Sequence, residues 1–306
     1  MNFPEHITGL KDLTKEQIEL ILNETGNFKN VLLDKNENIS ELLKGKSVIN
    51  LFFENSTRTR ISFELAEKLL GMKSVNFGAD ISSLSKGETE VDTIRNLDAM
   101  KFDYIVARHN EPGFPNIVID NSSAIVINAG DGINEHPTQG LLDMFTLQEI
   151  FGKLEGLKVC IIGDISHSRV ARSNIYGLKK FGAKISLCAP DVFLPKDMDE
   201  LGVVHINSMD DAVRKSDALI LLRVQLERDA GKFIPSMEEF HKEYGMTMAR
   251  LKLNPEIKIL HPGPWNAGVE LEQEIVEQDN FYGYRQVTNG VAVKLALFKL
   301  LDESNK

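Results

Sequence analysis

Short apolar runs alternate with longer amphipathic stretches along the whole chain. The first half contains the runs VINLFF, KSVNF, FDYIVAR and AIVINAG, and the second half contains VCIIGD, KISLCAP, VVHIN, ALILLR and IKILHPG. Runs without polar alternation are typical of strands buried on both faces, as in parallel sheets covered by helices. The pattern therefore predicts an α/β fold in which mainly parallel sheets are flanked by helices.

A long helical stretch at residues 136–152 separates the two series of strands, and a second one at residues 290–304 follows the last strand. A chain of 306 residues is long enough for about two domains. We therefore expect residues 1–150 and 151–289 to form two domains, each with its own sheet. The two long helices should join the domains, and the helix at 290–304 should pack back onto the first one.

The first elements have recognisable starts. Thr14 and Gln17 fit a capping box that opens a helix over residues 15–23. Further on, residues 48–53 have the pattern of a buried strand, and apolar residues at helical spacing follow over residues 59–70. A polar segment therefore connects this strand to this helix.

That polar segment carries Ser56, Thr57, Arg58 and Thr59 in consecutive positions. The N–H groups in the first turn of a helix have no intrahelical acceptor, and the helix dipole is positive at this end. Together with three hydroxyls and a guanidinium, these groups suit a tetrahedral oxyanion such as phosphate. A solvated helix cap is the simpler interpretation of any one of these residues, but their number and setting favour an anion site.

Composition and charge limit the possible functions. The net charge of −10 argues against a general nucleic-acid-binding protein, and the 42% hydrophobic content is that of an ordinary globular protein. We find neither a secretory leader nor an apolar stretch of membrane length, so we expect no membrane association and a cytoplasmic location. Cys160 and Cys188 lie inside strand patterns and should be buried free thiols. No Cys/His spacing is typical of a zinc site.

The stretch FFENSTRTRISFE resembles the carbamoyl-phosphate signature of the aspartate and ornithine carbamoyltransferases. Further segments resemble this family in the same order along the chain: SSLSKGET, ARH, HPTQGLLD, GDISHSRVARSN, RVQLER, HPGPW and TNGVAVK. Each segment alone is a weak match, but the ordered series covers nearly the whole chain.

The resemblance implies that the first domain binds carbamoyl phosphate. Residues 56–59, Arg108 at a strand end, and Ser82 from a neighbouring subunit would contact this substrate. His136 would donate a hydrogen bond to the carbamoyl oxygen, and Gln139 would hold the carbamoyl NH₂ group. A histidine beside a helix N-terminus is disfavoured as an imidazolium, so a neutral His136 suits this role.

The resemblance also implies which residues are catalytic and how subunits associate. The implied catalytic residues are Thr59, Arg108, His136 and Lys86. Lys86 lies in a polar loop that would reach into the active site of a neighbouring subunit, where it would also contact aspartate. The implied assembly is a homotrimer with shared active sites, and regulatory chains or the association of two trimers remain open.

The second domain would bind L-aspartate. The resemblance implies that Arg169 contacts the α-carboxylate and that Arg223 and Gln225 contact the β-carboxylate. Backbone carbonyls of Pro262 and Gly263 would face the carbamoyl NH₂ group and the attacking amine. Two separated guanidinium groups suit a dicarboxylate.

The implied reaction transfers the carbamoyl group of carbamoyl phosphate to the amine of L-aspartate, a committing step of pyrimidine synthesis. Phosphate is already an activated leaving group, and it would take the proton of the attacking amine. The enzyme would act through positioning and charge stabilisation, so we expect no metal and no organic cofactor.

Three alternatives remain. A relative that carbamoylates ornithine is disfavoured, because the Ser-Met-Gly and His-Cys-Leu-Pro segments are absent. A catalytically silent scaffold subunit should lack part of the phosphate cluster or Lys86, and a nicotinamide-dependent enzyme is opposed by the missing G-x-G-x-x-G spacing in GDISHSR.

The chain departs from many aspartate-type relatives at Trp265 and Ala267, where they have valine and arginine. This departure should change the local packing of the turn.

The implied role of Lys86 can be tested directly. Lys86→Gln should lower the rate of phosphate release by about 100-fold or more, because it removes one charged donor from the reacting anions. The trimer should stay intact when its native mass is measured. A variant with near-normal turnover would exclude this role.

Overall fold

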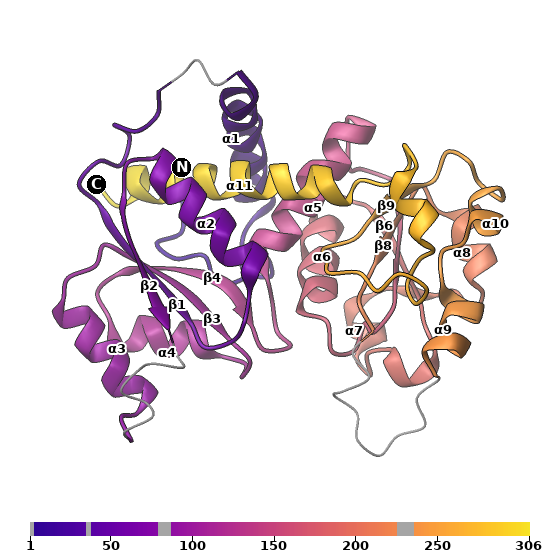
Figure 1. The fold of residues 1–306 in the computed structure, drawn as a ribbon, viewed down its shortest axis with the longest axis horizontal. Coiled ribbons are helices and arrows are strands. Elements are labelled where there is room, and N and C mark those ends of the chain that lie inside the picture. The colour runs from indigo at the N-terminus through magenta and orange to yellow at the C-terminus, as the bar shows by residue number, and fades with distance from the viewer. Residues whose placement is uncertain (1–2, 35–37, 79–86, 225–235) are drawn as a thin grey trace. The chain divides into compact units, whose positions relative to one another are not determined.

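The computed structural model describes residues 3–34, 38–78, 87–224 and 236–306 (Figure 1). The chain divides into two compact units. Unit 1 comprises Met1–Leu142 and Thr288–Lys306, and unit 2 comprises Asp143–Val287. The helices α5 (Pro137–Phe151) and α11 (Gly283–Ser304) each contribute residues to both units.

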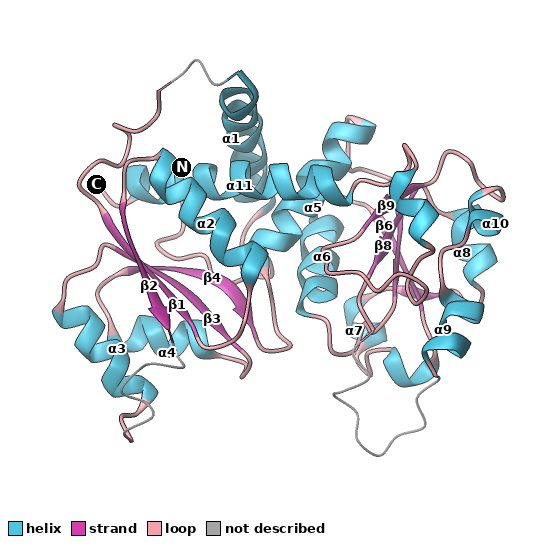
Figure 2. Cartoon of the chain, viewed as in Figure 1, coloured by secondary structure: helices cyan, strands magenta, loops and turns pink. Residues whose placement is uncertain are grey.

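Within the described part of unit 1, four parallel strands form a sheet in the order β2-β1-β3-β4 (Figure 2). Helices α3 and α4 pack together and contact the sheet through α4, whereas α2 contacts β1 and β2. The strands and helices that lie wholly in this unit are β1 (Ser47–Phe52), β2 (Lys73–Gly78), β3 (Tyr104–His109), β4 (Ile125–Asp131), α1 (Lys15–Asp34), α2 (Thr57–Leu69), α3 (Glu90–Ala99) and α4 (Phe114–Asn121).

In unit 2, the described residues form five parallel strands in the order β7-β6-β5-β8-β9. The strands and helices that lie wholly in this unit are β5 (Lys158–Ile162), β6 (Lys184–Cys188), β7 (Val204–His205), β8 (Ala218–Leu221), β9 (Lys258–Leu260), α6 (Arg169–Lys180), α7 (Met198–Leu201), α8 (Met209–Lys215), α9 (Met237–Tyr244) and α10 (Met248–Leu251). Both sheets are parallel and flanked by helices, which confirms the predicted fold class.

The local signals of the sequence explain several element boundaries. The capping box before α1 is present: the Thr14 N–H donates to Gln17 Oε1 at 2.9 Å, and the Gln17 N–H donates to Thr14 Oγ1 at 3.2 Å. The helix itself is longer than the predicted 15–23 and continues to Asp34. Gly71 follows the end of α2 with φ +79, where an added Cβ would lie 1.9 Å from the Ser40 carbonyl oxygen, so glycine is required there.

The buried face of α2 differs from the one suggested by its apolar spacing. Ile61 and Leu65 are 55% and 44% exposed. The face that packs inward instead contains Phe63, Ala66 and Glu67. The sequence does not indicate this face, because the face includes Glu67 and a charged residue is rarely buried in a protein core. Burial raises the pKa of Glu67 to about 7, and Asn50 Nδ2 donates a hydrogen bond to it at 3.1 Å.

Both cysteines are buried and free, as predicted. Cys160 lies in β5 and Cys188 ends β6, and burial raises the pKa of both thiols. They pack as small apolar residues in the core of unit 2. No helix in the described part of the chain is both long and apolar enough to span a membrane.

Lys294 is a buried cation in α11, and its side chain provides a test of the core of unit 1. It is 3% exposed, its ammonium donates to the Gly290 carbonyl at 2.9 Å, and it lies 5.0 Å from the centre of the Phe63 ring. Within the described residues it has no carboxylate within ion-pair distance. Desolvation lowers its pKa from 10.5 to about 7.

Lys294→Met should therefore stabilise the protein. Between pH 7 and 10.5 the unfolded chain holds a proton that the folded chain has released, so stability rises with pH in this window and the cost of Lys294 is greatest below it. We expect a gain of roughly 1–3 kcal/mol in the free energy of unfolding at pH 6, shrinking towards pH 10. Urea unfolding at several pH values measures this effect.

The matched control is Lys299→Met on the same helix. Lys299 pairs with Glu24 at 2.7 Å, and this hydrogen bond raises the pKa of the lysine. Its removal should lower stability or leave it unchanged. Equal effects of the two substitutions would show that the burial of Lys294 is not costly.

Candidate functional site

Three neighbouring strands of unit 1 lead to the residues of the predicted anion site. β1, β3 and β4 are adjacent and parallel, so their carboxyl ends lie at one edge of the sheet. Residues 56–59 follow β1, Arg108 lies near the end of β3, and His136 follows β4. The name unit 1 site is used below for Ser56, Thr57, Arg58, Thr59, Arg108, His136 and Gln139.

Arg108 connects these segments. Its Nη1 donates to the Ala129 carbonyl at 2.8 Å and lies 3.5 Å from Thr59 Oγ1 and 3.4 Å from His136 Nε2. Its Nε forms an ion pair with Glu54 Oε1 at 2.7 Å, and the side chain is only 11% exposed. The structure thus brings together three of the four predicted catalytic residues around one guanidinium nitrogen.

His136 lies immediately before α5 and is buried. A guanidinium carries only donors, so the contact with Arg108 favours the tautomer of His136 in which Nε2 accepts and the proton is on Nδ1. Nδ1 lies 3.3 Å from the Thr138 hydroxyl, which can accept from it in this tautomer. Gln139 is in the first turn of α5 and is partly buried, so both predicted residues belong to the same helix start.

The start of α2 offers further donors. Ser56 is the N-cap in an extended conformation, and its side chain does not cap the helix. Its hydroxyl and that of Thr57 make no hydrogen bond with the part of the chain that the structure describes. Arg58 is exposed, and limited desolvation lowers its pKa without removing its charge. These groups are available to an anion at the positive end of the helix.

Unit 2 repeats this arrangement with another three adjacent parallel strands, β5, β8 and β9. Arg169 opens the helix after β5, Arg223 follows β8, and Pro262 and Gly263 follow β9. The name unit 2 site is used below for these four residues. The parallel pairing places all of them beyond the same edge of the unit 2 sheet.

Local geometry fixes the start of α6 and the end of β8. Gly163 has φ +123, and an added Cβ would lie 2.5 Å from the Leu222 carbonyl oxygen, so glycine permits this close approach of the two chain segments. Ser168 caps α6 by accepting from the Ala171 N–H at 3.2 Å, and Arg169 is its first residue. Arg223 is exposed.

The turn after β9 is held by its own histidine. The Gly263 N–H donates to His261 Nδ1 at 2.9 Å, and Gly263 has φ +64. Trp265, the departure noted in the sequence, packs edge-on against Phe281 and Tyr284 with ring centroids 5.2 and 5.7 Å apart. The tryptophan therefore belongs to an aromatic cluster beside the turn.

Three predicted site residues, Ser82, Lys86 and Gln225, lie outside the described residues, and their roles stay predictions. Two contacts of the unit 1 site were not foreseen, those of Glu54 and Thr138. Glu54 gave no local signal for this contact, because its partner Arg108 lies in another strand, far away in the sequence. Thr138 gave no separate signal, because a threonine in a first helical turn is ordinary.

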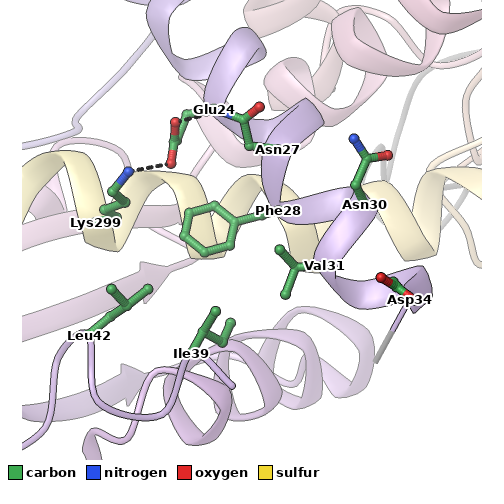
Figure 3. Close-up of a pocket in the computed structure, with 9 residues that line it drawn as sticks. All are labelled: Glu24, Asn27, Phe28, Asn30, Val31, Asp34, Ile39, Leu42 and Lys299. Carbon is green, nitrogen blue, oxygen red and sulfur yellow. Dashed lines mark hydrogen bonds and ion pairs between the residues drawn. The ribbon is translucent and has the colours of Figure 1, made fainter. Parts of the chain in front are cut away.

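A separate cavity of about 480 Å³ lies in unit 1, lined by α1, the 39–42 segment and α11 (Figure 3). Its carboxylate Glu24 accepts from Lys299 at 2.7 Å and from Asn27 Nδ2 at 3.0 Å. None of its lining residues belongs to the unit 1 site, so it does not bear on the anion site. Within the described ranges, no three His, Cys, Asp or Glu side chains are grouped so that they could hold a metal ion.

Comparison with known families identifies both parts of the chain. The model of the aspartate/ornithine carbamoyltransferase carbamoyl-P binding domain matches residues 5–149. The model of the aspartate/ornithine carbamoyltransferase Asp/Orn binding domain matches residues 155–301.

Individual relatives agree with this assignment. The chain is 49% identical to the aspartate carbamoyltransferase catalytic subunit of Acetivibrio thermocellus, over 96% of this chain and 95% of that protein. It is 47% identical to the one of Chlorobium chlorochromatii, over 99% of this chain and 100% of that protein.

Solved structures show the same fold. Aspartate transcarbamoylase from Trypanosoma cruzi, in complex with carbamoyl phosphate and aspartate, superposes with a TM-score of 0.89 at 30% identity, covering 97% of each chain. The catalytic subunit from M. jannaschii gives a TM-score of 0.86 at 32% identity, covering 99% of each chain. This chain therefore belongs to the aspartate/ornithine carbamoyltransferase family.

Proposed function

We propose that the chain is an aspartate carbamoyltransferase: it transfers the carbamoyl group of carbamoyl phosphate to L-aspartate, giving N-carbamoyl-L-aspartate and phosphate in de novo pyrimidine (UMP) synthesis. The observation that carries this proposal is the convergence of Thr59 and His136 on Nη1 of Arg108, at 3.5 and 3.4 Å, within a member of this family. The relatives named above are aspartate carbamoyltransferases, and one is solved with both substrates.

In unit 1, the phosphate would lie at the start of α2. The hydroxyls of Ser56 and Thr57, the Arg58 guanidinium and the first-turn N–H groups would surround its oxygens. Arg108 would contact both the phosphate and the carbamoyl oxygen. These donors exist before the substrate arrives, so little reorganisation is needed when negative charge develops on the leaving phosphate.

The carbamoyl oxygen would be polarised by Thr59, Arg108 and His136, and Gln139 would hold the carbamoyl NH₂ group. For this role His136 must carry its proton on Nε2, whereas the contact with Arg108 favours the other tautomer. Thr138 resolves this conflict, because its hydroxyl accepts from Nδ1 in one tautomer and donates to Nδ1 in the other. His136 can therefore change its tautomer without leaving a buried nitrogen unsatisfied.

In unit 2, Arg169 would bind the α-carboxylate of aspartate, and Arg223 with Gln225 would bind the β-carboxylate. The backbone carbonyls of Pro262 and Gly263 would accept from the carbamoyl NH₂ group and from the attacking amine. The amine attacks the carbamoyl carbon, the bond to phosphate breaks, and the leaving phosphate takes the proton of the amine. Positioning of two bound substrates supplies a large part of the rate enhancement.

The choice of aspartate over ornithine can be measured with one assay. Phosphate release from carbamoyl phosphate should be stimulated by L-aspartate and should stay at the background level with L-ornithine, because the proposed arginines pair with a second carboxylate. Stimulation by ornithine instead would assign the chain to the other branch of the family. Stimulation by neither would favour a catalytically silent subunit.

We also propose that the chain forms a homotrimer in which Ser82 and Lys86 serve the active site of a neighbouring subunit. Exposed apolar side chains on unit 1 support an association surface. Ile61 and Leu65 lie on α2, and Val75, which is 45% exposed, lies on the edge strand β2. Exposed apolar groups that share one region are typical of protein interfaces. Regulatory chains, trimer pairs and the cytoplasmic location stay predictions of the sequence.

The double substitution Ile61→Lys with Leu65→Lys should disrupt this trimer, because two ammonium groups would have to be desolvated at the interface. Native mass spectrometry should then show single chains, and activity should fall because the active sites are no longer shared. Leu33→Lys is the control, since Leu33 is likewise an exposed apolar residue, at 65%, but lies on α1. A double variant that keeps the mass of three chains would refute this interface.

A further inference from the structure

Glu270 is a buried carboxylate of unit 2 that the proposed mechanism does not use. It follows the turn after β9 and is 2% exposed. Both of its oxygens accept hydrogen bonds. Oε1 accepts from the Val224 N–H at 2.9 Å and from Asn266 Nδ2 at 3.1 Å, and Oε2 accepts from the Asn266 N–H at 2.6 Å.

The donors belong to the two segments that carry most of the unit 2 site. Val224 directly follows Arg223. A hydrogen bond that fixes the main chain at Val224 therefore also fixes the direction in which the Arg223 side chain leaves the main chain. Asn266 ends the turn that contains Pro262 and Gly263. One carboxylate therefore joins the end of β8 to the turn after β9, across 46 positions of the sequence.

A buried carboxylate is costly unless it receives several hydrogen bonds. Burial raises the pKa of Glu270, and the N–H groups of Val224 and Asn266 act against this rise. An apolar side chain would fill the same volume without this desolvation cost. A carboxylate is better explained by the three N–H donors around it, because among side chains of this size only a carboxylate has two acceptor oxygens that can take all three hydrogen bonds.

We propose that Glu270 is a positioning residue for aspartate, which holds the Arg223 segment and the Pro262–Gly263 turn in one geometry. This inference rests on the proposed function, in which Arg223 binds a carboxylate of aspartate and the turn presents its carbonyls to the reacting nitrogens. Glu270 itself does not touch the substrate. The proposal assigns the phosphate and the carbamoyl oxygen of carbamoyl phosphate to unit 1, so this substrate depends on Glu270 only through the turn carbonyls and should be affected much less than aspartate.

Glutamine is the sharpest substitution because it preserves the shape of the side chain. Its amide has one oxygen and one NH₂ group, whereas Glu270 uses both oxygens as acceptors. In either orientation the NH₂ group meets an N–H donor, so the bond to Val224 or the bond to the Asn266 main chain is lost. In one orientation the link to Val224 is lost, and in the other the turn loses its main-chain bond, so the connection between the two segments is weakened in either case.

Glu272 provides a matched control in the same segment. Its Oε2 accepts from the Met248 N–H at 2.6 Å, so it is also a carboxylate bonded to a backbone amide. Its partner begins α10 and belongs to neither site. Glu272→Gln should therefore lower stability as the loss of such a hydrogen bond does, but it should not change the KM for aspartate.

The experiment measures kcat, the KM for aspartate and the KM for carbamoyl phosphate in the wild type, Glu270→Gln and Glu272→Gln, together with thermal unfolding. Glu270→Gln should raise the KM for aspartate about tenfold or more, because a charge-assisted hydrogen bond that orders the site is lost. Its KM for carbamoyl phosphate should stay within about twofold. Glu272→Gln should keep both KM values.

Equal KM values for aspartate in Glu270→Gln and Glu272→Gln would overturn the inference, as would a parallel change for both substrates. If Glu270→Gln does not fold, Asn266→Ala takes its place, since it removes only the side-chain donor. Its KM for aspartate should rise about threefold, and an unchanged value would overturn the inference. A wild-type enzyme that is inactive with aspartate would instead refute the proposed function, so the two failures can be told apart.

Discussion

The parallel pairing of adjacent strands is the constraint on which both sites depend. In unit 1, β1, β3 and β4 run in the same direction, and in unit 2, β5, β8 and β9 do so. Each strand therefore delivers the segment that follows it to the same edge of its sheet, although these segments are far apart in the sequence. The convergence of Thr59, Arg108 and His136 follows from this arrangement, since each belongs to a different strand or its exit.

Buried carboxylates accept backbone N–H groups from segments beside the unit 1 sheet. Glu135 accepts from the N–H groups of Leu10 and Lys11 at 2.7 and 3.0 Å, which anchors the residue before His136 to the N-terminal segment. Asp131 accepts from the Gly113 N–H at 2.7 Å at the start of α4. Buried acceptors of this kind fix loops at modest net gain, but their loss is costly. They give the loops of the sites the rigidity that positioning requires.

Local patterns predicted the parts of the structure that local physics determines. Strand runs, the capping box at Thr14 and the polar start of α2 were all readable, because each depends on neighbouring residues alone. Local patterns did not place Thr59 and His136 beside Arg108, because these contacts depend on the strand order β2-β1-β3-β4; only the resemblance to the family implied that the three share a site. The inward face of α2 was hidden because it includes Glu67, and the cluster around Trp265 depends on contacts with Phe281 and Tyr284. Contacts between segments far apart in the sequence were therefore harder to predict than the secondary structure of each segment.

The net charge of −10 raises the question of how such a chain could hold an anion in the proposed unit 1 site. Arg108 gives the physical answer. Its Nη1 donates to the Ala129 carbonyl and its Nε lies 2.7 Å from Glu54 Oε1, so a hydrogen bond and an ion pair hold the guanidinium in place before any ligand binds. Fixing a long side chain in advance removes an entropic cost that binding would otherwise carry, and burial strengthens each charge interaction that follows. In the proposed site, a paired and buried arginine would recognise an anion through its orientation and its surroundings, whereas charges elsewhere on the surface of the chain are screened by salt.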